Sequence, residues 1–295
     1  MPTVIPTTPF ALLSGSAGWG IRFPDDLAEP GVRVLDRWLA FDTPWGPVDN
    51  WQVLELDGAL TPDGRPRTVL NVFSHGWPHD AIDNGVHRRV AWILRQAGAR
   101  KVLADSTCGS LNKAIVPRDL VLPRDALDFS QTLHSGMAGR LRHQALAKQL
   151  FCPAMAKALE GVARERWPAP GRVLGHGQEV VAVHNWGPRF TSRAEARAYQ
   201  MMGGDVVNQS IGPEASALRE IGACFASHSY VVCWEDGIVA MPDFDIDPIH
   251  RELAFAATRI SLHALARAPA DDACGCAALR IERAASYAAF APPFA

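Results

Sequence analysis

Apolar and polar residues alternate along this chain in a way that predicts short strands separated by helices. Apolar runs suited to buried strands occupy residues 10–13, 67–73, 101–104, 180–183 and 224–232. Stretches with apolar residues at helical spacing occupy 84–97, 154–166 and 247–266. This interleaving of strands and helices favours an α/β protein in which helices cover a sheet.

Local signals set the boundaries inside residues 180–235. Ser192 and Glu195 have the spacing of a capping box, which starts a helix. Glycines 203 and 204 end that helix, because glycine adopts positive φ without a steric penalty. Pro213 suits the first turn of the next helix. The segment therefore predicts a strand–helix–strand–helix–strand unit.

The last long helix is predicted to begin with Asp247 as its N-cap and Pro248 in the first helical position. One face of this helix carries an apolar stripe that we expect to be buried, namely Leu253, Ala256, Ile260 and Ala264. The helix over 84–97 carries a similar stripe and ends at Gly98, the stripe being Val86, Val90, Ile93 and Leu94.

Composition narrows the class of protein. A chain of 295 residues with 48% hydrophobic residues forms one large domain or, as the alternative, two small ones. A net charge of −2 and a pI of about 6.5 give no basic field to attract nucleic acid or anionic lipid. We also expect no membrane span, since no apolar run approaches ~20 residues. With no signal-peptide pattern at the N-terminus, we expect a cytoplasmic protein.

Several motifs occur in a fixed order. They read DTPWG at 42–46, SHG at 74–76, TCGSL at 107–111, GPRFTSRAE at 187–195, GDVVN at 204–208 and PE at 213–214. Together they resemble the trimeric purine nucleoside phosphorylase and methylthioadenosine phosphorylase family, and the resemblance is nearer to the second. It extends over roughly residues 12–236.

The resemblance implies a nucleoside phosphorylase fold. We expect one domain over residues 1–295, with an N-terminal arm at 1–9 and a C-terminal tail at 268–295. Its α/β architecture would be a central mixed, twisted, partly barrel-like sheet flanked by helices. The family also implies a homotrimer.

A phosphate site is expected where a small-residue turn follows the first strand. The turn at 14–20 lets backbone N–H groups close on an anion. By resemblance, the residues around phosphate would be Ser16, Ser74, His75, Ser106, Thr107 and Ser210, with His75 and Ser210 as catalytic residues. Ser74 replaces a family arginine that can bind phosphate through two hydrogen bonds, which predicts weaker phosphate affinity or another co-substrate.

The base and ribose would, by resemblance, contact Phe190, Trp186, Asn208, Gln209, Tyr230 and Val232. Two family carboxylates that hold the purine are replaced here by Tyr230 and Val232. A tyrosine hydroxyl retains one hydrogen bond, whereas valine retains none. Glu235 or Asp236 is a candidate substitute. Gln209 and Trp186 also depart from the family residues, which are methionine and glutamate.

The implied reaction is phosphorolysis of a purine nucleoside, 5'-methylthioadenosine or a close relative, to free base and (methylthio)ribose 1-phosphate. Such a pentosyltransferase would serve purine and methionine salvage. Inorganic phosphate is the co-substrate, and we expect no cofactor and no metal. One alternative is a weak or inactive phosphorylase-like protein that binds a planar aromatic ligand. Another is a hydrolase, or a phosphorylase for an unusual nucleoside-like substrate.

The chain contains six cysteines. We expect Cys108, Cys224 and Cys233 to be buried as small hydrophobic residues. The pair Cys274 and Cys276 has three interpretations: a strained disulfide, a metal site completed by partners, or an exposed reduced dithiol. We expect the last.

Overall fold

A computed structural model describes residues 4–73, 85–129, 143–187, 189–241 and 245–282. Five α-helices are formed in these ranges: α1 (Val86–Ala97), α2 (Pro153–Arg166), α3 (Arg193–Met201), α4 (Ile211–Glu220) and α5 (Asp247–Arg267). The strands are β1 (Phe10–Ser14), β2 (Val32–Phe41), β3 (Val48–Leu56), β4 (Arg67–Phe73), β5 (Lys101–Ser110), β6 (Leu120–Val121), β7 (Asp125–Asp128), β8 (His143–Ala145), β9 (Val173–Leu174), β10 (Val181–His184), β11 (Val206–Asn208), β12 (Cys224–Trp234) and β13 (Arg280–Glu282).

One large mixed sheet organises the molecule. Its main path runs β2-β3-β4-β1-β5-β11-β10-β7, and β12 pairs with β5 outside this path and leads on to β6 and β9. The strands β1, β4, β5 and β12 are mutually parallel where they pair, whereas β2, β3 and β11 join antiparallel neighbours. The expected mixed sheet is therefore confirmed. Among the described strands it is forked and does not close into a barrel.

The fork lies along β5. Residues 101–104 of this strand pair with β1, and residues 109–110 pair with β11. On its other edge β5 pairs with β12 from Lys101 to Ser110. Since β1 ends before β11 begins, residues 105–108 face an opening between two strands. Open α/β sheets place ligands at such points, where neighbouring strands diverge.

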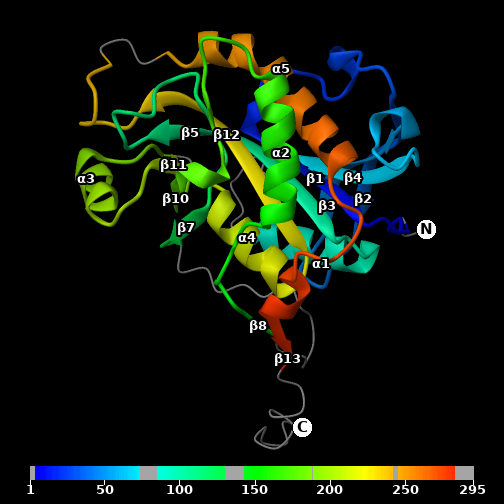
Figure 1. Cartoon of the computed structure of the whole chain (residues 1–295). Helices are drawn as coiled ribbons and strands as arrows, with labels where there is room; N and C mark the ends of the chain where they lie inside the picture. The colour runs from blue at the N-terminus through cyan, green and yellow to red at the C-terminus, as the bar shows by residue number, and fades with distance from the viewer. Residues whose placement is uncertain (1–3, 74–84, 130–142, 188, 242–244, 283–295) are drawn as a thin grey trace, which may run out of the picture.

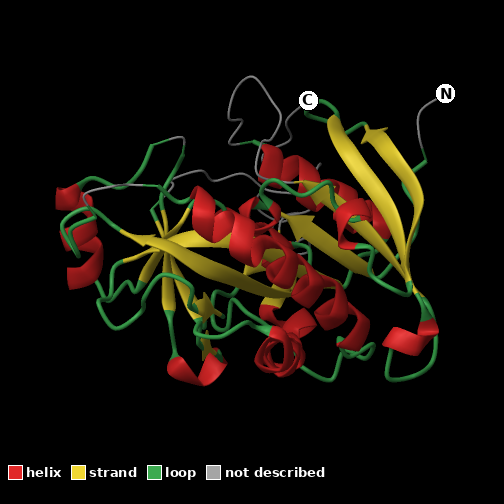
Figure 2. Ribbon diagram, turned by 90° about the horizontal axis from the view of Figure 1, so that it is seen from above, coloured by secondary structure: helices red, strands yellow, loops and turns green. Residues whose placement is uncertain are grey.

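Helices cover both faces of the sheet (Figures 1 and 2). On one face α1 and α4 pack with Ala11 and Leu13 of β1. On the other, α2 and α5 pack with Leu12 of β1 and Leu103 of β5. Because parallel strands covered on both faces bury every side chain, their sequences are continuously apolar. This explains the unbroken apolar run at 10–13.

The boundary signals in 180–235 are largely confirmed. The capping box forms: Ser192 Oγ accepts a hydrogen bond from Glu195 N at 3.3 Å, and Glu195 Oε2 accepts one from Ser192 N at 2.9 Å. Gly203 has a φ of +88° directly after α3. The strand expected at 180–183 is shifted by one residue to 181–184.

The start of α5 corrects the predicted cap. Asp247 is the first helical residue and Ile246 occupies the N-cap position. The backbone N–H of Asp247 donates to the carboxylate of Asp245 at 3.0 Å, so a residue upstream takes the capping role. Of the predicted stripe, Leu253, Ile260 and Ala264 are buried, whereas Ala256 is half-buried.

The burial of the cysteines agrees only partly with the expectation from the sequence. Cys108, Cys224 and Cys233 are buried, which confirms the first expectation. The expectation of an exposed dithiol at the other pair is wrong for Cys276, which is fully buried because η5 (Cys276–Leu279) folds onto the protein. Its neighbour Cys274 is half-buried.

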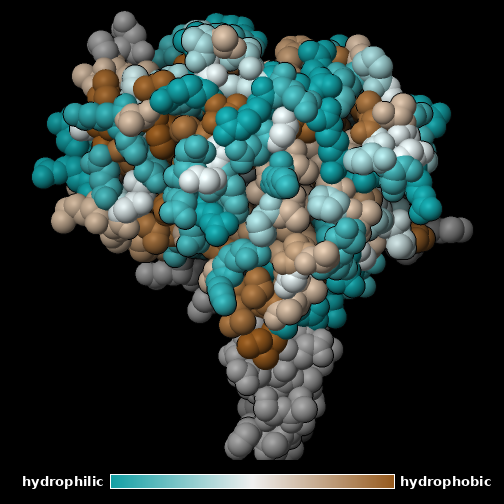
Figure 3. Space-filling model, viewed as in Figure 1, coloured by the Kyte–Doolittle hydropathy of each residue, from teal (hydrophilic) through white to brown (hydrophobic). Residues whose placement is uncertain are grey.

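The surface is mostly polar. Figure 3 shows hydrophilic side chains over most of the visible face, with hydrophobic ones interspersed. In the described part of the chain no helix combines the length and the apolar content needed to cross a bilayer.

Arg67 ties the end of α5 to the sheet. Its side chain is buried, and Nη1 donates to the carbonyl oxygens of Leu265 and Ala268, both at 2.7 Å. Its guanidinium also lies 4.6 Å from the ring centre of Phe10. Carbonyl groups at a helix end have no partner inside the helix, so this arginine satisfies two of them.

We predict that Arg67→Met lowers the free energy of unfolding by about 2 kcal/mol, because two buried carbonyls lose a charged donor. Arg65→Met is the matched control, since the side chain of Arg65 is exposed. Urea denaturation of both variants measures the difference. Equal effects of the two substitutions would show that Arg67 does not anchor α5.

Candidate active site

Hydroxyl and amide groups converge at the fork of the sheet. Ser16 lies in the turn after β1, and its Oγ is 2.9 Å from Oγ1 of Thr107 on β5. The backbone N–H of Thr107 also donates to Ser16 Oγ at 3.0 Å. Thr107 belongs to residues 105–108, which pair with neither β1 nor β11. The loss of a strand neighbour therefore leaves room for this side-chain contact.

Asn208 connects this pair to the start of α4. Its Nδ2 donates to Ser106 Oγ at 2.7 Å and to Thr107 O at 3.1 Å. Its Oδ1 accepts from Ser210 N at 2.8 Å, Ser210 Oγ at 3.1 Å and Ile211 N at 2.8 Å. One amide thus joins β5, β11 and the N-terminus of α4. We call Ser16, Ser106, Thr107, Asn208 and Ser210 the hydroxyl cluster.

The turn that follows β1 is held by a hydrogen bond to the buried Asp105 carboxylate. Gly15 N donates to Asp105 Oδ1 at 2.9 Å, and Ser261 Oγ of α5 donates to Asp105 Oδ2 at 2.9 Å. His228 Nε2 lies 2.8 Å from Ser261 Oγ. Since burial lowers the pKa of His228 to about 3, the imidazole is neutral at neutral pH. The Asp105 carboxylate therefore takes up one N–H of the turn that was expected to close on an anion.

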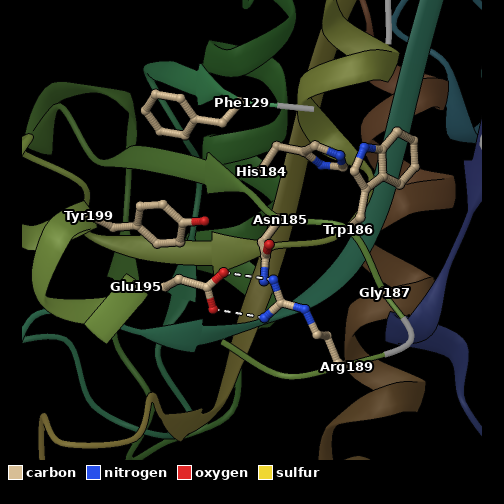
Figure 4. A pocket seen from close by; sticks show the side chains of 8 residues that line it. All are labelled: Phe129, His184, Asn185, Trp186, Gly187, Arg189, Glu195 and Tyr199. Carbon is tan, nitrogen blue, oxygen red and sulfur yellow. Dashed lines mark hydrogen bonds and ion pairs between the residues drawn. The ribbon is translucent and has the colours of Figure 1, made fainter. Parts of the chain in front are cut away.

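A cavity of about 450 Å³ opens at the end of β10 (Figure 4). It is lined by Phe129, His184, Asn185, Trp186, Gly187, Arg189, Glu195 and Tyr199. The cavity adjoins the cluster because β10 pairs with β11, and Asn185 N donates to Asn208 O at 3.0 Å. This volume falls in the range of small-molecule sites, and the aromatic lining suits a planar ligand.

Aromatic rings occupy both sides of the cavity. Phe129 stacks on Tyr199 with ring centres 5.8 Å apart and planes 3° from parallel. Across from them, His184 meets Trp186 edge to face at 4.7 Å, as Figure 4 shows. Tyr199 projects from α3, whereas His184 ends β10. Residues distant in sequence thus form two opposed aromatic walls.

His184 has an unusual environment. It is 1% exposed, and within the described residues neither ring nitrogen has a hydrogen-bond partner. Burial lowers its pKa to about 4, so the ring is neutral at neutral pH. A neutral imidazole offers one donor and one acceptor. Both nitrogens are buried, so the ring contributes an edge-to-face contact with Trp186 rather than an accessible hydrogen-bonding group.

An ion pair closes the lower rim of the cavity in Figure 4. Arg189 Nη1 and Nη2 contact the two carboxylate oxygens of Glu195 at 2.7 and 2.6 Å. The Arg189 hydrogen bond lowers the pKa of Glu195 to about 2. Gln209 reaches the same loop, since its Nε2 donates to Arg189 O at 3.1 Å. Glu195, which belongs to the capping box of α3, thereby also fixes the loop after β10.

Behind the cavity lies a buried carboxyl group. Glu235 is 5% exposed, and burial raises its pKa to about 7 against the opposing effect of hydrogen bonds with Thr191. Thr191 Oγ1 in turn lies 3.3 Å from Asn185 Nδ2, which faces the cavity. A Cβ at Gly109 would lie 2.0 Å from Glu235 Oε1, so any side chain there would displace this carboxyl group.

The structure brings together most of the residues expected to bind phosphate. Ser16, Ser106, Thr107 and Ser210 share the hydroxyl cluster with Asn208, and Trp186 lines the adjoining cavity. The expected residues Ser74 and His75 lie outside the described residues. Their roles stay predictions.

Three residues that were expected to contact the base do not line this cavity. Phe190 is 55% exposed and is not part of the cavity lining. Tyr230 is fully buried, and its hydroxyl meets Ala17 O at 3.2 Å and His250 Nδ1 at 2.9 Å. Val232 packs in the core under α2 and α5. The alternation of β12 explains this, since positions 230 and 232 share a face.

Of the eight residues that line the cavity, only Trp186 was predicted as a site residue. The three aromatic residues Phe129, His184 and Tyr199 are among those that were not anticipated. A usable signal existed for His184, because it directly follows an apolar run, at the strand end where such sheets bind ligands. Phe129 lies in a stretch of irregular sequence, and Tyr199 reads as one more residue of a helix face. Only the three-dimensional arrangement assigns these two.

Comparisons with known proteins agree with this geometry. The family model of the phosphorylase superfamily matches residues 67–259. A probable S-methyl-5'-thioinosine phosphorylase of Methanothermobacter thermautotrophicus is 32% identical over 203 residues, which are 68% of this chain and 65% of that one. The S-methyl-5'-thioadenosine phosphorylase of Drosophila melanogaster is 26% identical, over 86% of this chain and 85% of its own.

The fold is also shared with solved structures. A methylthioadenosine phosphorylase from Schistosoma mansoni in complex with adenine has a TM-score of 0.70 at 22% identity, covering 91% of this chain and 95% of that one. The chain therefore belongs to the phosphorylase superfamily. The resemblance inferred from its motifs, nearer to the methylthioadenosine phosphorylases, is confirmed.

The raised pKa of Glu235 predicts a pH-dependent stability. Its ordinary pKa is 4.5 and the folded value is about 7, so between these pH values only the unfolded chain gives up this proton. Wild-type stability therefore falls as pH rises through this window. We expect Glu235→Gln to remove this loss, on the order of 3 kcal/mol between pH 4 and pH 8.

Urea denaturation at both pH values measures this difference. Glu179→Gln serves as the control, because Glu179 is exposed and its loss removes the same formal charge. The same pH dependence in Glu235→Gln and the wild type would contradict a protonated carboxyl at this position.

Proposed function

We propose that this protein catalyses phosphorolysis of a purine nucleoside, 5'-methylthioadenosine or a close relative. The products would be the free base and (methylthio)ribose 1-phosphate. The observation that carries the proposal is the hydroxyl cluster beside an aromatic cavity, at the fork of a phosphorylase-superfamily sheet. The names of the relatives in that superfamily support a methylthio-purine nucleoside.

The reaction transfers the sugar from base to phosphate. A phosphate oxygen forms a bond to C1' as the bond between C1' and the purine nitrogen breaks, and that electron pair moves onto the purine. The transition state carries positive charge on the sugar, so a phosphate held under C1' acts through both proximity and charge. No redox step occurs, and we propose that phosphate is the only co-substrate.

The hydroxyl cluster is proposed to hold the phosphate. Ser16 and Thr107 offer hydroxyl groups from two elements, and Asn208 fixes the position of Thr107. The Ser210 hydroxyl would turn from Asn208 Oδ1 toward the phosphate to add a third donor. The family arginine is absent, with Ser74 in its place. Neutral donors bind an anion less strongly than a guanidinium does, so we propose a high KM for phosphate.

The cavity is proposed to hold the base. Trp186 and the stacked pair Phe129–Tyr199 provide apolar surfaces, while Asn185 provides a polar amide group. An amide both donates and accepts hydrogen bonds, so it is suited to the edge of either an adenine or a hypoxanthine. The two family carboxylates are not needed in this arrangement.

We also propose the homotrimer that the family implies. Support comes from exposed apolar side chains around the cavity and α3: Phe129, Phe190, Met201 and Met202, with exposed fractions of 45%, 55%, 87% and 49%. Exposed clusters of this kind occur at protein interfaces. A role in methionine salvage in the cytoplasm follows from the proposed substrate.

The second candidate function is a phosphorylase-like protein that binds a planar ligand without turnover. One observation favours it. The hydroxyl of Tyr230, which replaces a family carboxylate, is already engaged by Ala17 and His250 in the core.

An assay of base release separates these candidates. Methylthioadenosine, methylthioinosine, adenosine, inosine and guanosine are incubated with the protein, with and without phosphate. We expect release that depends on phosphate, and fastest with a methylthio nucleoside. Release without phosphate would instead identify a hydrolase. Tight binding without release would identify the ligand-binding alternative.

Substitution of Thr107 tests the phosphate site directly. Thr107→Val keeps the shape and removes one hydroxyl donor, so we expect the KM for phosphate to rise about tenfold. The KM for the nucleoside should change little. Thr68→Val, at the amino end of β4, is the matched control. An unchanged phosphate KM in Thr107→Val would rule out this hydroxyl as a phosphate ligand.

A further inference from the structure

Four cysteines gather far from the cavity. Their Sγ atoms all lie within 4.8 Å of one another, and the residues are Cys152, Cys224, Cys274 and Cys276. Three are buried and Cys274 is half-buried. We call them the four-cysteine cluster. They come from three separate parts of the chain: the residue before α2, the first residue of β12, and the segment after α5.

The sulfur spacing fits a tetrahedral tetrathiolate. A Zn–S bond of about 2.3 Å places tetrahedral sulfurs about 3.8 Å apart. The Sγ atoms of Cys224 and Cys274 are 3.3 Å apart, and no pair exceeds 4.8 Å, so the observed spacing brackets that value. A disulfide would require about 2.0 Å. All four residues are free thiols.

The backbone turns so that both sulfurs of the C-x-C pair face the cluster. Gly275 has a φ of +72°, a conformation that glycine adopts without strain. Its N–H donates to Asp272 O at 3.3 Å, which closes the turn. The one-residue spacing is shorter than the usual two to four, and the glycine compensates for this.

Two buried cations approach the cluster. Lys101 is 2% exposed, and its Nζ lies 3.5 Å from Cys224 Sγ while also pairing with Asp272. Arg219 is 1% exposed and donates to Cys276 O at 3.1 Å. Positive charge of this kind lowers the cost of burying negative sulfurs, and groups around the ligands commonly orient them.

We propose that the four-cysteine cluster binds one structural Zn²⁺ ion. Four thiols release four protons as the ion binds, which leaves a zinc tetrathiolate with a net charge of −2. Four protein ligands leave no position for water or substrate, so the site is structural and takes no part in the reaction. Its occupant is a soft, thiolate-preferring divalent cation, in contrast to Mg²⁺ or Ca²⁺.

The ion would clip the C-terminal part of the described chain to the sheet. A backbone hydrogen bond already holds Cys152 next to the start of β12, since Cys152 N donates to the carbonyl oxygen of Phe225, the neighbour of Cys224, at 2.6 Å. Cys274 and Cys276 add the segment that follows α5. A metal that binds only the folded chain stabilises it, because the site does not exist in the unfolded chain.

The test uses untagged full-length protein, prepared under reducing conditions without chelator, and metal analysis by mass spectrometry. We expect about one zinc per chain. Cys274→Ser should lose zinc, and this substitution disturbs packing least because Cys274 is the most exposed ligand. Cys233→Ala is the control, since Cys233 is buried outside the cluster, and it should keep its zinc.

Two further readouts apply to the unaltered chain. Co²⁺ added to metal-free protein should give the absorption of a tetrahedral cobalt thiolate. The thermal midpoint should fall on zinc removal, recover with Zn²⁺ and not recover with Mg²⁺. These readouts decide the proposal even if Cys274→Ser does not fold.

Three results would overturn the proposal. One is protein without zinc that gives no cobalt–thiolate absorption. Another is equal zinc content in Cys274→Ser and Cys233→Ala. The third is an intact mass lower by four hydrogens, which would identify two disulfides in the cluster. None of these results depends on phosphorolysis.

Discussion

The change of partner along the edge of β5 is the constraint from which the site follows. Paired backbone leaves no opening in a sheet, and residues 105–108 are the point where β1 has ended and β11 has not begun. Side chains must supply the missing connections there. Asn208 does so with one amide that reaches β5 and the first turn of α4 at once. The hydroxyl cluster is thus also a structural joint.

The motifs and apolar runs predict much of this arrangement. Continuous apolar runs identify the central strands because helices cover both faces, and Ser192 with Glu195 marks the start of α3. The hydroxyl residues of the cluster were predicted because they stand at positions of the family's short motifs. These features are local in sequence, so a pattern along the chain carries them.

The features that the sequence did not predict depend on where side chains point in the folded structure. Tyr230 sits where a family carboxylate would be, yet its ring packs in the core and its hydroxyl is satisfied there. Phe129 and Tyr199 form one stack from two distant segments. The C-x-C pair suggested an exposed dithiol because its partners, Cys152 and Cys224, are separated from it by long stretches of chain.

Strand β12 connects the four-cysteine cluster to the fork of the sheet. Its first residue belongs to the four-cysteine cluster and its last, Trp234, pairs with Ser110 beside the fork. Between these ends β12 pairs with β5, with one register shift between Val231 and Cys233. Release of the cysteine end would therefore loosen the strand that leads to Glu235, whose carboxyl group lies behind the cavity. A site that takes no part in the reaction would in this way still affect the rigidity of the cavity.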